Sequence, residues 1–231
     1  MKTLCPQCQE TTELTVPVNW QDFGCPHCHR YFKKTADGTL QESGVYRKPN
    51  TPFTFHIGQQ GILDGVRWEV GGMFIKYPVN EAFGWREYTL YSADGKTRFL
   101  SESDGHWIIA EEIEPAEMFK FGNLHGHLHD GVFYKIFHNT RFETTYAAGF
   151  FEHPVAKEGK AKDFVHGQNA LLLEQEPGKK TYAFLARHLP ETELRAAFPD
   201  TELPARSGRG MLQPFPVDIA ALTWILGGAA V

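Results

Sequence analysis

Residues 5–28 read CPQCQETTELTVPVNWQDFGCPHC and hold all four cysteines of the chain, in two Cys-Pro-x-Cys pairs. Sixteen residues separate the pairs, a spacing typical of zinc ribbons. Within each pair, two intervening residues let both sulfur atoms turn toward one point. Two pairs can therefore supply the four ligands of a tetrahedral Zn²⁺. The stretch predicts one structural zinc, bound by Cys5, Cys8, Cys25 and Cys28.

Redox chemistry is the main alternative for these cysteines, because C-x-x-C also marks thioredoxin-like sites. That interpretation requires a βαβ context, which the surrounding sequence does not show. Four thiolates would fill the coordination sphere and leave no position for a substrate water, so we expect no catalytic zinc. His27 and His29 flank the second pair and are expected to be surface residues rather than ligands. The predicted role of the ribbon is docking.

Charge and composition limit the classes of function. The 231 residues include 23 Lys and Arg against 28 Asp and Glu, a net charge of -5. Such a chain is a poor candidate for sequence-independent nucleic-acid binding, which depends on basic side chains at phosphates. All cysteines lie in the ribbon, and the first residues lack the apolar run of a signal peptide. We therefore expect a cytoplasmic protein.

The sequence after the ribbon predicts a mainly β fold. Short runs rich in Val, Ile, Phe, Tyr and Trp alternate with turn dipeptides, as in sheets built from hairpins. The turns are Asp64-Gly65, Asp94-Gly95, Asp104-Gly105, Asp130-Gly131 and Pro177-Gly178. We expect strands over residues 53–57, 66–76, 85–92, 97–101, 107–111, 132–138, 142–148, 170–174 and 181–187.

This pattern divides the chain into five segments. We predict a zinc ribbon over residues 1–42, a linker rich in Gly, Pro and polar residues over 43–52, and then two related β units. The units span residues 53–118 and 119–200, and each is expected to be a strongly bent sheet or a partly closed small barrel. The last segment, 201–231, is predicted to be irregular and then to form an apolar helix.

A weak internal repeat relates the two units. The run DGVRWEV at residues 64–70 matches DGVFYKI at 130–136, an offset of 66 residues. In both copies an Asp-Gly turn precedes a strand with an aromatic residue at one fixed place. A second hairpin also recurs, since DGKTRFL at 94–100 resembles PGKKTYAFL at 177–185. The repeat predicts two similar β units packed side by side.

Helix is expected at two places near the C-terminus. Pro190 and the acidic residues after it favour a short helix that ends near Phe198. Residues 219–231 carry no charge, and Asp218 can cap a helix there. Thirteen apolar residues are fewer than the about 20 that span a bilayer. Two interpretations stay open: a core or interface helix, and the first half of a membrane anchor.

The sequence WREYTL at residues 85–90 resembles the W-x-E-Y-x-L signature of a bacterial family, domain of unknown function 4178. The neighbouring VRWEVGG at 66–72 and the run Gly105-His106-Trp107 fit that family. So does GVFYKI at 131–136, although Lys135 stands where Trp is usual. The resemblance implies an N-terminal zinc ribbon, a hydrophobic C-terminal segment that favours the anchor, and association with bacterial membrane or envelope stress systems. It implies no catalytic residues.

Three histidines form the sharpest candidate for additional chemistry. In a strand, His125, His127 and His129 would face one side, next to Asp130, and could bind a second metal ion. Alternate residues of a strand lie about 6–7 Å apart, so three imidazoles rarely reach one ion without a bend. The alternative is a polar strand edge with solvated histidines.

A ligand groove is the other candidate. Aromatic residues of the predicted strands could line it together with one carboxylate, which could act as a general acid or base if buried. More simply, Glu87 would pair with Arg67 or Arg98 while the rings pack the core. The candidate groove residues are Trp68, Trp85, Glu87, Tyr88 and Tyr134.

Together these observations favour a non-enzymatic binding or scaffold module whose partner is another protein, in the cytoplasm or tethered to the inner membrane. Two alternatives stay open. One is a metal-dependent enzyme centred on His125, His127 and His129. The other is nucleic-acid binding through the ribbon, which the negative net charge disfavours. The sequence does not determine the oligomeric state.

Overall fold

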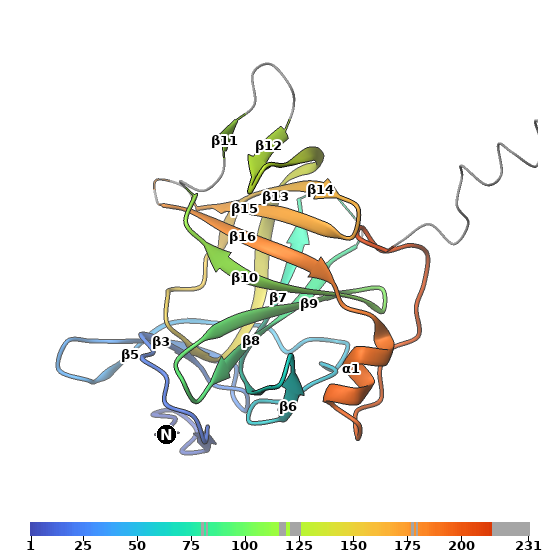
Figure 1. The fold of residues 1–231 in the computed structure, drawn as a ribbon. Helices are drawn as coiled ribbons and strands as arrows, with labels where there is room; N and C mark the ends of the chain where they lie inside the picture. The colour runs from blue at the N-terminus through green and yellow to red at the C-terminus, as the bar shows by residue number, and fades with distance from the viewer. Residues whose placement is uncertain are drawn as a thin grey trace, which may run out of the picture.

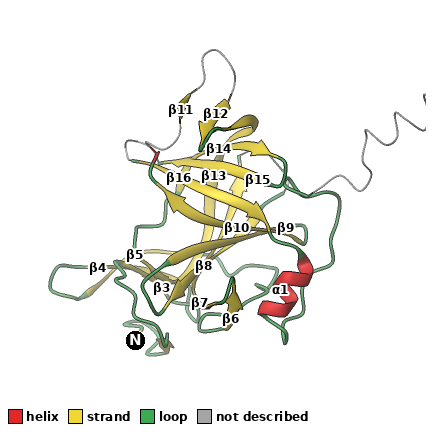
Figure 2. Cartoon of the chain, viewed as in Figure 1, coloured by secondary structure: helices red, strands yellow, loops and turns green. Residues whose placement is uncertain are grey.

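The structure, a computed structural model, describes residues 1–79, 81, 83–115, 119–120, 126–176, 178 and 180–213. Strands dominate these residues, and the one α-helix among them, α1 (Glu191–Ala197), lies at the side of a barrel (Figure 1 and Figure 2). The prediction of a mainly β fold with a short helix is confirmed. The apolar run 219–231 lies outside the described residues. Within the described part, no helix has the length and apolar character needed to cross a membrane.

Eight antiparallel strands close into the barrel. They follow the order β13, β14, β15, β16, β10, β9, β8 and β7, and pairing between β7 and β13 completes the circle. The first half consists of β7 (Val66–Pro78), β8 (Trp85–Ser92), β9 (Thr97–Ser103) and β10 (His106–Ile113). The second half consists of β13 (Val132–Phe151), β14 (Glu158–His166), β15 (Asn169–Gln175) and β16 (Thr181–His188).

The two halves are built alike. Each is a bent four-stranded sheet preceded by a short strand, β6 (Gln60–Leu63) or β12 (Gly126–His129). The first strands of the halves, β7 and β13, pair at one seam, and the last strands, β10 and β16, pair at the other. The predicted units thus meet as complementary halves of one barrel. Neither half could bury its concave face alone, because the opposite wall comes from its counterpart.

The repeat at an offset of 66 residues falls at equivalent points of the two halves. Asp64 and Gly65 have φ angles of 53° and 74°, and Asp130 and Gly131 have 47° and 75°, as two-residue hairpin turns require. The second correspondence is wrong. Residues 94–100 lead into β9, the third strand of its half, whereas 177–185 lead into β16, the fourth. Turn residues recur wherever a tight hairpin forms, so the likeness carries no positional information.

Several predicted strands differ in the structure. Residues 53–57 form no strand; their Phe55 packs on the outer face of the first half. The predicted strands 132–138 and 142–148 are one strand, β13, with a change of register between Ile136 and His138. Strand β14, EGKAKDFVH, was not expected because its charged and glycine residues hide the apolar alternation.

The ribbon is joined directly to the barrel. Strands β1 (Lys2–Leu4) and β2 (Thr11–Glu13) pair with each other, and β3 (Asp22–Gly24), β4 (Arg30–Lys34) and β5 (Leu40–Val45) form a sheet that continues onto the end of β13. Strand β5 enters the predicted linker 43–52. The remaining strand, β11 (Phe119–Lys120), pairs with β12. The ribbon is thus bonded to the barrel through backbone as well as side chains.

Three glycines allow this junction. Gly149 of β13 lies opposite Gly24 of β3 on one side and Gly72 of β7 on the other. A Cβ at Gly149 would lie 2.2 Å from the carbonyl oxygen of Gly71, and one at Gly24 would lie 2.5 Å from that of Ala147. The φ of Gly149 is also +102°, which side-chain-bearing residues rarely adopt. Only glycine fits where the ribbon sheet meets the barrel.

The substitution Gly149→Ala is expected to weaken this junction by roughly 3 kcal/mol, because backbone strain and steric overlap add at one residue. Urea denaturation measures the loss. Gly44→Ala is the matched control, since its Cβ would meet only the Nζ atom of Lys157, at 3.9 Å. Equal stability of the two variants would contradict the proposed close approach.

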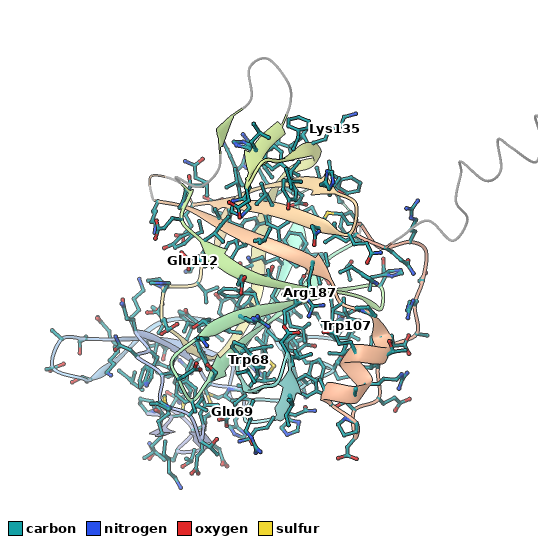
Figure 3. The ribbon with its side chains drawn as sticks, viewed as in Figure 1. Trp68, Glu69, Trp107, Glu112, Lys135 and Arg187 are labelled. Atoms are coloured by element: carbon teal, nitrogen blue, oxygen red, sulfur yellow. The ribbon has the colours of Figure 1, made fainter. Side chains whose placement is uncertain are left out.

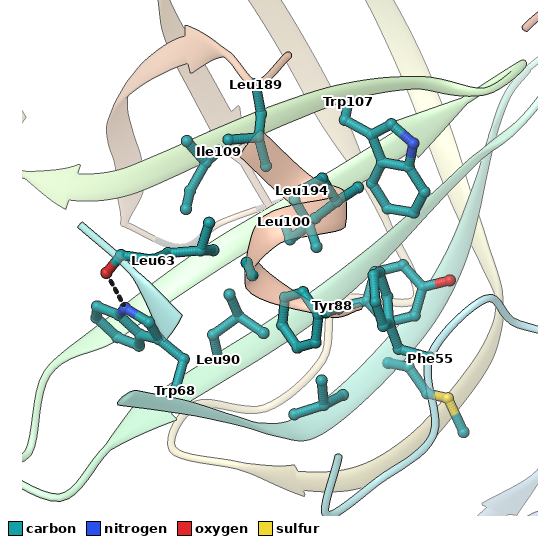
Figure 4. Close-up of a cluster of buried hydrophobic side chains, with 14 of the residues drawn as sticks. Phe55, Leu63, Trp68, Tyr88, Leu90, Leu100, Trp107, Ile109, Leu189 and Leu194 are labelled. Carbon is teal, nitrogen blue, oxygen red and sulfur yellow. Dashed lines mark hydrogen bonds between the residues drawn. The ribbon is translucent and has the colours of Figure 1, made fainter. Parts of the chain in front are cut away.

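The largest apolar cluster lies outside the barrel wall. This cluster consists of side chains on the outer face of the first half, among them Tyr88, Leu100 and Trp107. They pack against Leu194 of α1 and against Phe55, which precedes β6 (Figure 4). Trp68 belongs to the same cluster, and its Nε1 donates to the carbonyl oxygen of Leu63 at 3.3 Å. This layer covers one face of the first half with apolar contacts and leaves the barrel interior for other side chains.

Candidate metal centre

The four cysteines lie on two knuckles of the same local structure. In each knuckle, the backbone carbonyl oxygen of the first cysteine accepts a hydrogen bond from the N–H of the residue four positions later. The backbone N–H of the same cysteine donates to the carbonyl oxygen of the residue five positions later. Gln9 and His29 stand just after the second cysteine of each pair, and both have a φ of 62°. This left-handed turn brings the two sulfur atoms of a pair to one side. The bonds are Gln9 N to Cys5 O, Cys5 N to Glu10 O, His29 N to Cys25 O and Cys25 N to Arg30 O.

The sulfur atoms converge on one point. The Sγ atoms of Cys5 and Cys28 lie 3.6 Å apart, as do those of Cys8 and Cys25. All four ligand atoms lie within 4.8 Å of one another. Tetrahedral bonds of about 2.3 Å place sulfur atoms about 3.8 Å apart, whereas a disulfide needs about 2.05 Å. The four cysteines could therefore hold one metal ion, as the sequence predicts.

Burial and charge also suit a cation. Cys5 and Cys25 are buried, while Cys8 and Cys28 are half-buried. Burial raises the pKa of the Cys25 thiol, against the opposing effect of backbone N–H groups of Cys28 and His27 that point at its sulfur. A divalent cation would supply the positive charge that converts these thiols into thiolates.

A buried carboxylate fixes the ribbon to the barrel. Glu69 of β7 is 1% exposed, and it lies beside Trp68 near the base of the barrel (Figure 3). Its oxygens accept hydrogen bonds from the backbone N–H of Thr15 at 2.9 Å, from the Thr15 hydroxyl at 2.7 Å and from the N–H of Val16 at 3.0 Å. The segment between the two knuckles is thus held by the first half of the barrel.

Apolar contacts complete this attachment. Phe23 of β3 and Phe150 of β13 lie with ring centroids 5.1 Å apart, and the hydroxyl of Tyr91 donates to the carbonyl oxygen of Phe150 at 2.9 Å. Cys5 and Cys25 belong to the same buried cluster. The four-cysteine cluster therefore lies against the barrel rather than on a detached knob.

The predicted histidine site is placed only in part. His125 lies outside the described residues. His127 and His129 are on β12. The ring centroid of His127 lies 4.6 Å from that of Phe164, and Nε2 of the buried His129 lies 3.7 Å from the Asp130 carboxylate. Among the described residues, the four cysteines are the only group of metal-ligating side chains close enough to share an ion. A metal site at the histidines stays a prediction.

The predicted groove residues fall into three places. Trp68 and Tyr88 are buried in the cluster outside the first half, and Tyr134 is buried in a cluster of the second half. Trp85 and Glu87 lie together, with the Trp85 indole donating to Glu87 at 2.9 Å. The structure therefore groups Trp68 with Tyr88 and Trp85 with Glu87, and the groove as a whole stays a prediction.

Glu87 does not pair with Arg67 or Arg98, contrary to our expectation. Its carboxylate lies 2.9 Å from the ammonium of Lys76, which also contacts Glu174 at 2.7 Å. Arg98 instead pairs with Asp64 at 2.5 Å. The reason is the alternation along β8, which directs Glu87 into the barrel and its neighbours Arg86 and Tyr88 outward.

This interior charge cluster was missed by sequence reasoning. Lys76 ends the apolar run VGGMFIK, and Glu87 lies within the aromatic run WREYTL of the next strand. Opposite charges inside two apolar strands joined by one hairpin are a signal that could have revealed the pair. The third member, Glu174, is almost 100 residues away and only the barrel brings it near.

Comparison with known proteins gives one result. No curated protein and no solved structure gives a match. One family model matches residues 56–191, a range that begins before β6, includes all eight strands of the barrel and ends at the start of α1. The ribbon lies outside this range. The match covers more than half of the chain, so the protein belongs to the family described as "Domain of unknown function (DUF4178)".

Proposed function

We propose that the protein is a non-enzymatic protein-binding module whose ribbon holds one structural Zn²⁺ and presents a strand edge to a partner protein. The observation that carries the proposal is the position of β5. It is the last strand on its side of the sheet, and among the described strands it pairs only with β4. Exposed edges of this kind accept an extended segment of a partner as an added strand.

The surface of β5 supports this role. Five residues of β4 pair with one edge of β5, and none of the described strands pairs with its other edge. Val45 is 61% exposed at the end of the strand, where an added strand of a partner could cover it. Metal binding would fix this edge, because β3 and β4 flank the second cysteine pair.

A metal with four thiolate ligands supports the non-enzymatic part of the proposal. No coordination position would remain for water or substrate, so the ion would act on folding rather than on chemistry. The family resemblance also implies association with a membrane. That expectation concerns the location of the partner protein, and binding through the edge of β5 does not depend on it.

Substitution at the edge tests the proposal. Val45→Lys places a charge on β5, a device by which natural proteins block strand addition, and it is expected to abolish capture of the partner from cells that encode the protein. Ile62→Lys is the matched control, because Ile62 is 56% exposed on β6, at a different edge. Equal capture by both variants, measured by affinity purification after crosslinking, would refute binding through β5.

A further inference from the structure

We propose that the charged cluster inside the barrel, formed by Lys76, Glu87, His138, Asp163 and Glu174, is a proton-dependent latch. It holds the two halves of the barrel together more tightly in mild acid than at neutral pH. We call these five residues the Lys76 cluster.

The contacts of the cluster cross the barrel interior. Lys76 lies on β7 and Glu174 on β15, and two strands, β13 and β14, separate them around the wall. Their charged atoms nevertheless lie 2.7 Å apart. Lys76 also contacts Glu87 of β8 at 2.9 Å, so one ammonium links the first half to the second. The Lys76 side chain is only 7% exposed, and its ammonium lies 4.8 Å from the centre of the Phe142 ring.

The charges in this space do not balance. Asp163 of β14 faces the same interior and lies 3.7 Å from the imidazole of His138 on β13. The other nitrogen of His138 lies 3.4 Å from Glu81, in the turn between β7 and β8. With His138 neutral, the carboxylates of Glu87, Asp163 and Glu174 share one ammonium. Taking up one proton at Asp163 or Glu174 reduces the net charge of these four groups from -2 to -1.

The titration behaviour of the carboxylates agrees with this geometry. Burial raises the pKa of Asp163 to about 6, with the Glu87 carboxylate adding to the shift and His138 opposing it. Burial likewise raises the pKa of Glu174, although Lys76 opposes the change. Lys76 stays charged, because Glu174 and Glu87 outweigh the effect of burial and raise its pKa.

The sign of the pH dependence follows from these directions. The pKa of Asp163 is about 6 in the folded protein and about 4 in an unfolded chain, so folding takes up a proton between these values. The contribution of Asp163 to stability is therefore present below pH 4 and is lost as the pH rises through 6. The barrel end that carries the Lys76 cluster should open less often at pH 5.5 than at pH 7.5.

Hydrogen exchange of β14 and β15 tests the latch in the whole protein. After correction for intrinsic exchange rates, the opening constant of these strands is expected to be about fourfold smaller at pH 5.5 than at pH 7.5 through Asp163 alone, because its pKa is about 6 in the folded protein and about 4 in an unfolded chain, and Glu174 adds to this factor. Asp163→Asn should remove the contribution of Asp163, about fourfold, and adding Glu174→Gln should bring the ratio close to one.

The control variant is Glu158→Gln, which removes a carboxylate that is 55% exposed on the same strand, β14, and should keep the wild-type ratio. Glu174→Gln alone serves if Asp163→Asn fails to fold. Wild-type strands that open more often at pH 5.5, or variants that retain the full ratio, would overturn the proposal.

Discussion

Replacing Cys25 by Ser is expected to release the metal and unfold the ribbon while the barrel stays closed. Cys25 is 0% exposed, and its sulfur lies 3.6 Å from that of Cys8. A hydroxyl is a poor ligand in a thiolate site, and the binding free energy of structural zinc, roughly 10–16 kcal/mol in small fingers, is also folding free energy. The eight strands of the barrel pair in a circle that includes no ribbon strand, so we expect the barrel to close without the ribbon.

Two measurements check this result. Metal analysis should give about one zinc per wild-type chain and none for Cys25→Ser. Hydrogen exchange should show lost protection for β1 to β4 and retained protection for β8 to β10. His27→Ser is the matched control, because His27 lies inside the same knuckle but is not one of the four grouped ligands. A Cys25→Ser variant that keeps its metal would show that the four cysteines do not form the site.

Loss of Phe23 and Phe150 packing should accompany ribbon unfolding. The ring of Phe23 in β3 packs on that of Phe150 in β13, so an unfolded ribbon would leave Phe150 and Tyr91 facing water. We therefore expect the variant to lose stability in the barrel as well, though less than in the ribbon, through lost apolar burial. Simultaneous collapse of both parts would mean that the ribbon is required for the barrel to fold.

Lys76→Met is expected to destabilise the barrel by about 3–5 kcal/mol, the usual consequence of removing one partner of a buried ion pair. Met fills a similar volume, so the cost comes from Glu87 and Glu174, which lose their shared cation. For a domain of this size the melting temperature should fall by roughly 10–15 °C. Thermal unfolding followed by circular dichroism measures the change.

Two further variants separate charge from packing. Lys160→Met removes an exposed lysine of β14 and should leave the melting temperature within about 2 °C of wild type, as for most surface substitutions. Adding Glu87→Gln and Glu174→Gln to Lys76→Met should restore much of the lost stability, because no uncompensated charge remains. If the triple variant is no more stable than Lys76→Met, packing rather than charge explains the effect. The deficit of Lys76→Met should also shrink at pH 5, where protons replace the missing cation.

Local patterns in the sequence were enough to predict the metal-site cysteines and several strands. The spacing of Cys5, Cys8, Cys25 and Cys28 depends only on short-range geometry, since two residues bring both sulfurs of a pair to one side. The strand from Trp85 to Ser92 and the turns at Asp64-Gly65 and Asp130-Gly131 are also local features. Strand β14 was not predicted from the sequence. Its first buried positions hold Gly and Ala between exposed Lys residues, so the alternation of buried and exposed side chains involves no large apolar residue there.

The sequence by itself therefore determined the four-cysteine site, the β character of the chain and the likeness of its two halves. Tertiary structure alone decided that the halves close into one barrel, that the ribbon is joined to β13 at Gly149, and that Lys76 meets Glu174. The physical reason is distance along the chain. Knuckles and hairpins form between residues a few positions apart, whereas barrel closure and the contact of Lys76 with Glu174 join residues separated by about 70 to 100 positions, which no local pattern encodes.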